Sequence, residues 1–166
     1  MQVGFDMIQN QGGIPEEWLI LDSGSTDTVF CSCNFLKDII ACTDEESLDL
    51  TSNSGGAMEY YLKSEMKIFP ISVFYNEDSL ANIISLFNLI KAPGVHIHMD
   101  SSIDYGFKVT YDGKIYHFKP FDTGLYYYDT TDTPVLAADN TSLVKNNNVV
   151  SSYSFIQTVE DNKKNF

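Results

Sequence analysis

The amino-acid sequence predicts a mainly β fold, and three observations support this prediction. Short apolar or alternating runs recur along the chain, turn residues separate them, and helical spacing is confined to two short segments. With 166 residues, 43% of them hydrophobic and 20% charged, the chain has the size and composition of one globular domain. We therefore expect a closed or partly closed β-barrel with one or two short helices.

The first predicted strand covers residues 18–21, a continuous apolar run of Trp-Leu-Ile-Leu. It stops at Asp22, which opens the sequence Asp-Ser-Gly-Ser, as expected of a buried strand that enters a turn. Further along the chain, the apolar residues of 35–40 suit one or two helical turns.

Residues 48–51 and 58–62 are the next two extended segments. They flank Ser-Asn-Ser-Gly-Gly at 52–56, which predicts a hairpin with a flexible glycine tip. Residues 67–75 are typical of another strand, and Pro70 within it indicates an edge or a bulge.

A second hairpin has the clearer signal. Residues 106–111 and 114–119 flank Asp112-Gly113, a dipeptide that strongly favours a two-residue hairpin turn. The aromatic run at 124–128 predicts one more strand. Beyond Thr133 the sequence turns polar, and we divide the chain into a lead-in (1–13), a barrel domain (14–130) and a polar linker or tail (131–166).

The charge balance argues against two classes of partner. Asp and Glu outnumber Lys by 23 to 10, Arg is absent from the sequence, and the formal net charge is −13. A chain without a basic cluster lacks the electrostatic footprint of direct nucleic-acid binding or of docking on an anionic membrane. The start of the sequence has no basic segment followed by an apolar one, so we expect an intracellular protein.

The cysteines indicate free thiols. Cys31, Cys33 and Cys42 are odd in number and clustered, unlike a disulfide framework. Tetrahedral zinc needs four ligands, and the three histidines lie far along the chain without matching pairs. We therefore expect no metal and no cofactor.

One segment has the residues for chemistry: Asp22-Ser23-Gly24-Ser25-Thr26. A carboxylate at the end of an apolar strand lies beside a desolvated core, and the glycine removes the Cβ that would block a substrate or a second backbone. Taken alone, these letters also spell an ordinary turn.

The surrounding sequence resembles the retropepsin-like aspartic proteases, in particular those of copia-type retrotransposon Gag-Pol polyproteins. The similarity extends from about residue 17 to 129 and rests on four stretches, at 18–26, 29–31, 80–86 and 124–129. The segment 158–163 is also similar to the stretch before the integrase region of such polyproteins.

This resemblance implies roles for the residues of the motif. Asp22 is the expected catalytic aspartate, and Ser23 is the hydroxyl that braces the active-site loops. Gly24 is the loop glycine, Ser25 tunes the carboxylate, and Thr26 completes the loop.

The resemblance also implies a flap over the substrate and a strand behind the active-site loop. The flap tip falls at Ser54, Gly55 and Gly56, and the strand at Ile83 and Ile84. Helical spacing alone predicts a helix across 80–90, whereas the family pattern places a strand at 81–84 and a helix at about 86–91. We follow the family pattern here.

An aspartic protease needs two facing carboxylates that share one proton, so that one activates water while the other protonates the developing oxyanion. The sequence has one Asp-Ser-Gly segment. The resemblance therefore implies a homodimer, in which each chain supplies one of the two carboxylates. Its substrate would be a polypeptide, the polyprotein itself. We expect it to act in the cytoplasm, including within virus-like particles.

One other function stays open at this point, and a third is disfavoured. The chain could be a catalytically silent β-barrel module, from a decayed or domesticated protease domain, that serves interaction or structure. A hydrolase with Cys31 or Ser25 as nucleophile lacks a plausible local base.

Overall fold

The computed structural model describes residues 13–51 and 56–137, and these residues form a mainly β fold with one α-helix. In chain order the elements are β1 (Trp18–Asp22), β2 (Val29–Phe30), the short 3₁₀ helix η1 (Cys33–Phe35), β3 (Ile40–Ala41), β4 (Leu48–Thr51), β5 (Ala57–Tyr60), β6 (Leu62–Glu65), β7 (Ser72–Tyr75), β8 (Asn82–Ser85), α2 (Leu86–Lys91), β9 (His96–His98), β10 (Phe107–Tyr111), β11 (Lys114–Pro120), β12 (Tyr126–Asp129) and β13 (Val135–Leu136).

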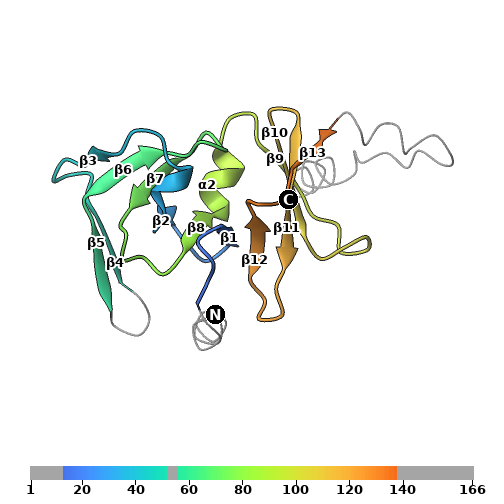
Figure 1. Cartoon of the computed structure of the whole chain (residues 1–166), viewed down its shortest axis with the longest axis horizontal. Helices are drawn as coiled ribbons and strands as arrows, with labels where there is room; N and C mark the ends of the chain where they lie inside the picture. The colour runs from blue at the N-terminus through green and yellow to red at the C-terminus, as the bar shows by residue number, and fades with distance from the viewer. Residues whose placement is uncertain (1–12, 52–55, 138–166) are drawn as a thin grey trace, which may run out of the picture.

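Eleven of these strands form one sheet in the order β3-β6-β7-β2-β8-β1-β12-β11-β10-β9, with β13 beside β11. β4 and β5 form a separate two-stranded hairpin. Figure 1 shows this hairpin at one end of the molecule and β9 to β13 at the other, with β1, β8 and α2 between them. The first predicted strand thus lies in the interior of the sheet.

β1 is apolar at every position from 18 to 21 because both of its faces are covered. It pairs in parallel with β8 and antiparallel with β12. Leu19 and Leu21 point into the main core, whereas Ile20 packs on the opposite face with Ala81 and Leu125. A strand buried on both faces shows a continuous apolar run in place of alternation.

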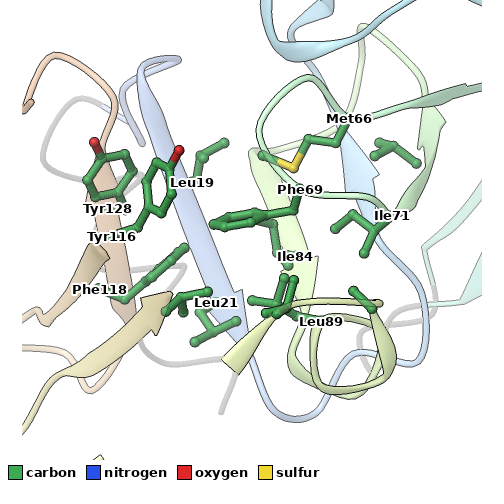
Figure 2. Close-up of a cluster of buried hydrophobic side chains, with 14 of the residues drawn as sticks. Leu19, Leu21, Met66, Phe69, Ile71, Ile84, Leu89, Tyr116, Phe118 and Tyr128 are labelled. Carbon is green, nitrogen blue, oxygen red and sulfur yellow. The ribbon is translucent and has the colours of Figure 1, made fainter. Parts of the chain in front are cut away.

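A single main core joins the two ends of the molecule. Phe69 lies between the β8 region and the aromatic side chains of β11 and β12 (Figure 2), and its ring meets that of Tyr116 edge to face, with centroids 5.0 Å apart. Phe69 and Phe118 are both fully buried. Each such side chain stabilises the fold by roughly 1.5–3 kcal/mol through removal from water.

Several predicted elements are confirmed. Residues 82–85 form β8 and residues 86–91 form α2, as the family pattern implied. The helix that spacing alone predicted across 80–90 is wrong, because Asn82, Ile84 and Ser85 are buried in the sheet. The Asp112-Gly113 hairpin is confirmed, and both turn residues have positive φ, 48° and 70°, as a two-residue hairpin turn of this type requires.

Other elements differ from the prediction. β7 begins only at Ser72, because the chain bends through 66–71 and Met66 N–H donates to Ile71 O. Pro70 therefore lies in the bend and outside the strand. Residues 58–62 are split between β5 and β6, and the only helical turn between 33 and 40 is η1.

Strand pairing continues beyond residue 130, where the barrel domain was expected to end. β13 pairs with the start of β11, with Ile115 opposite Val135. No closed barrel is found among residues 13–51 and 56–137, so closure stays a prediction. In the same ranges, no helix is long and apolar enough to cross a lipid bilayer.

Candidate active site

Asp22 is the last residue of β1, and the strand register sets its position. It lies opposite Ser85, the last residue of the parallel strand β8. The Asp22 side chain is half-exposed, and its Oδ1 accepts a hydrogen bond of 2.8 Å from Gly24 N–H. This bond closes an Asx turn that directs the chain away from β1. Among the described residues, no hydrogen bond reaches the other carboxylate oxygen, Oδ2.

The loop from 23 to 28 joins β1 to β2, and β8 lies between these two strands. Ile83, in β8, pairs with Ile20 on one side and with Val29 on the other. Ile84 is fully buried in the main core. β8, with Ile83 and Ile84, thus occupies the gap that the loop spans.

The hydroxyls of the loop make local contacts. Ser23 and Thr26 are exposed, and Thr26 Oγ1 donates to Asp27 Oδ2 at 2.9 Å. Ser25 Oγ donates to the backbone oxygen of Asp27 at 2.7 Å and does not bond Asp22. Within the described part of the chain, Ser23 has no hydrogen-bonding partner for its hydroxyl. The bracing role of Ser23 and the tuning role of Ser25 stay predictions.

Three residues that sequence reasoning missed hold the loop against β8 and α2. Ser85 Oγ donates to Ser25 O at 2.7 Å, and Ser85 N–H donates to Thr28 Oγ1 at 3.1 Å. Asn88 Nδ2 donates to the same Thr28 oxygen at 3.3 Å. Thr28 and Ser85 are almost completely buried. In the sequence, Thr28 directly precedes the apolar pair at 29–30, and Ser85 directly follows the apolar pair at 83–84.

A buried side-chain amide, that of Asn82, holds the start of β8, at the end of the strand opposite Ser85. Asn82 is fully buried; its Oδ1 accepts from Ser32 N–H at 2.9 Å, and its Nδ2 donates to Glu16 O at 2.8 Å. The side chain therefore links three segments that are distant in sequence. Burial without these partners would cost about 1–3 kcal/mol per polar group.

The predicted flap falls partly outside the described residues. Ser54 and Gly55 lie there, and Gly56 is exposed next to β5. The β4–β5 hairpin is attached at its base, where Tyr60 Oη and Ser79 Oγ are 2.9 Å apart and Asn76 Nδ2 donates to Glu59 O at 3.0 Å. These contacts connect the hairpin to the segment that follows β7.

Two hollows on the surface of the single chain lie away from Asp22. One, of about 400 Å³, lies in the β3–β6–β7 region and is lined by Ile40 and by polar and charged residues that include Lys37 and Lys63. The other, of about 360 Å³, is an apolar groove between α2, β9 and β10, with Ile90 and Met99 on its walls. Asp22 lines neither hollow.

Among the described residues, neither the thiols nor the acidic groups form a second candidate site as well defined as that of Asp22. Cys31, Cys33 and Cys42 are free, and burial raises the pKa of the Cys31 thiol. A raised pKa makes Cys31 a poor nucleophile at neutral pH. Within the ranges that the structure describes, no three His, Cys, Asp or Glu side chains converge in a way that could hold a metal ion.

Comparison with known proteins returns no match for this chain among protein-family models, curated proteins or solved structures.

Proposed function

We propose that the chain is the aspartic endopeptidase domain of a copia-type retrotransposon polyprotein, active as a homodimer with a retropepsin-like barrel. The observation that supports this best is the position of Asp22. Its carboxylate ends a strand that is buried on both faces, and one carboxylate oxygen stays free of hydrogen bonds from the described residues. A nucleophilic water needs such a group, held firmly and still accessible.

The topology around Asp22 gives further support. The loop after Asp22 spans β8, and one buried and one partly buried hydrogen bond attach it to Ser85, the residue opposite Asp22. The order of the segments along the chain (Asp-Ser-Gly turn, hairpin, β8 strand, α2 helix) is the order that the resemblance implies.

A single chain supplies one Asp-Ser-Gly carboxylate, and neither surface hollow is lined by it. In the proposed dimer, the Asp22 side chains of two copies face each other across the symmetry axis and share one proton. The unprotonated carboxylate takes a proton from water as it attacks the scissile carbonyl, and the protonated one donates to the oxyanion. The substrate cleft then forms only between the two copies.

The direct test is Asp22→Asn, which keeps the shape of the side chain and removes the shared acid–base pair. Pepstatin-sensitive cleavage of a polyprotein-derived peptide should fall by at least about 10²–10⁴-fold, because one substitution changes both halves of the dyad. The control is Asp122→Asn, an exposed carboxylate between β11 and β12, which should cleave at the rate of the unmodified chain.

Unchanged cleavage by Asp22→Asn would contradict the assignment. Absence of cleavage by the unmodified chain, at a concentration where it is dimeric, would favour the silent interaction module.

A further inference from the structure

We propose that Ser85 is a positioning residue for Asp22: its hydroxyl and its backbone N–H hold the loop that follows the aspartate. The expected effect of Ser85 on catalysis rests on the proposed function. Its structural part, the attachment of residues 23–28 to the β8–α2 junction, can be tested separately.

The pairing register of β1 and β8 places Ser85 beside the loop that follows Asp22. Ser85 lies opposite Asp22 at the common end of two parallel strands, so its side chain faces the loop that leaves β1. Its Oγ donates to the carbonyl oxygen of Ser25 at 2.7 Å. The Ser25 carbonyl is therefore fixed three residues after the carboxylate.

The Ser85 hydroxyl is oriented by a second bond. Ser85 is the N-cap of α2, and its Oγ accepts from Asn88 N–H at 3.3 Å. Because a hydroxyl has one proton, acceptance from the helix leaves that proton for the Ser25 carbonyl. One side chain thus caps the helix and anchors the loop at the same time.

The other end of the loop is anchored to the same residue. Thr28 Oγ1 accepts from Ser85 N–H at 3.1 Å and from Asn88 Nδ2 at 3.3 Å. Ser85 and Thr28 have relative exposures of 0% and 1%, so the bond between them is shielded from water, whereas the bond from Asn88 is partly shielded. Removal of the Ser85 hydroxyl would leave the partly buried Ser25 carbonyl without its donor.

The expected consequence is a loss of catalytic rate with little change in substrate affinity. A displacement of about 1 Å of a catalytic group can cost about 10²-fold in rate. We expect Ser85→Ala to lower kcat by about 10- to 100-fold and to leave KM nearly unchanged, since Ser85 is buried and contacts no substrate surface. Ser85→Thr keeps the hydroxyl and should recover most of the rate.

The matched control is Ser64→Ala. Ser64 is also buried, in β6, and its Oγ also donates to a backbone carbonyl, that of Glu65, at 3.2 Å. β6 contains neither the loop residues 23–28 nor the residues that anchor the loop. Ser64→Ala should therefore lower the urea midpoint modestly and leave kcat per folded molecule unchanged.

The experiment measures kcat, KM and the urea midpoint of the unmodified chain and these variants, together with hydrogen exchange of the Gly24 amide. Gly24 N–H is bonded to Asp22 Oδ1, so its exchange reports the order of the loop without need of activity. We expect exchange to accelerate by about tenfold in Ser85→Ala and not in Ser64→Ala. If Ser85→Ala does not fold, Asn88→Ala removes only the outer bond to Thr28 and should give a smaller change of the same sign.

The outcomes separate the two proposals. If the unmodified chain is inactive but Gly24 exchange accelerates in Ser85→Ala alone, the positioning role is supported and the endopeptidase function is contradicted. If kcat per folded molecule and Gly24 exchange are both unchanged in Ser85→Ala, Ser85 only caps α2 and the positioning role is overturned.

Discussion

At the scale of single residues, the candidate site depends on polar side chains inside the fold. Sequence reasoning found Asp22 because a carboxylate directly after an apolar strand is visible locally. It missed Thr28 and Ser85, because their roles follow from a parallel register between segments more than fifty residues apart. Such a register leaves no mark in the spacing of either segment.

Tyr128 is a second residue whose environment has a measurable consequence. Burial is the main cause that raises its pKa to about 12, with Tyr116 and Asp132 as further contributors. Its hydroxyl donates to Asp132 O at 2.8 Å, and its ring meets that of Tyr116 edge to face. The neutral phenol is therefore favoured in the folded state.

We expect stability to fall as pH rises from about 10 to about 12. An unfolded tyrosine ionises near pH 10, whereas folded Tyr128 ionises only near pH 12, so the unfolded state loses its proton first across this window. Below pH 10 Tyr128 makes its full contribution to the free energy of unfolding. Urea unfolding at pH 9, 10.5 and 11.5 measures the slope with which this free energy falls as pH rises.

Tyr128→Phe should flatten this slope, although not completely, because burial also raises the pKa of Tyr60 and Tyr116. Tyr105→Phe, at a residue that is 68% exposed, is the matched control and should keep the full slope. An equal slope in Tyr128→Phe and the unmodified chain would contradict this account.

At the scale of elements, local turn chemistry was the most reliable guide. The β10–β11 hairpin was predicted from Asp112-Gly113, and its two strands pair over five residues in the expected register. The bend at 66–71 was not predicted, because Phe69 and Ile71 are apolar core residues and give the segment the composition of a strand. Core packing overrode local propensity there.

The hairpin turn gives a prediction at this scale. Gly113 has φ of 70°, and a Cβ added there would meet no atom within 4 Å, so Gly113→Ala tests the backbone alone. We expect a loss of about 1–2 kcal/mol in the free energy of unfolding, the usual cost of a left-handed alanine. Asp112→Gly, at φ of 48°, removes the strain of a side chain and should be neutral or slightly stabilising.

Both variants are to be compared by urea unfolding at one pH. A Gly113→Ala protein as stable as the unmodified chain would contradict the turn geometry. A strongly destabilised Asp112→Gly protein would do the same.

At the scale of the whole molecule, the pairing of β1 with β12 could not be predicted. Trp18 lies opposite Asp129, a separation of 111 residues, and the two are joined by a 3.3 Å bond from Trp18 Nε1 to Asp129 Oδ2. Each strand was predicted from its own apolar or aromatic run. Their partnership depends on packing, including the stacking of Trp18 on Tyr127 with ring centroids 3.9 Å apart.

The central claim is that two copies of the chain build one catalytic site, because each contributes a single Asp22. This claim makes the activity of a mixture predictable. Chains that exchange freely pair at random, and only dimers with two unmodified aspartates are expected to cleave. The inactive Asp22→Asn chain should therefore inhibit the unmodified chain by mixed pairing.

The most direct measurement is the cleavage rate of a fixed amount of unmodified chain, above its dimerisation midpoint, as Asp22→Asn protein is added. With a threefold excess of the variant, random pairing leaves about one quarter of the original activity. In the control, the same excess of active Asp122→Asn protein should raise the rate about fourfold, because every dimer is then active. A cleavage rate that does not change when Asp22→Asn protein is added would show that each chain acts alone, and would contradict the shared dyad.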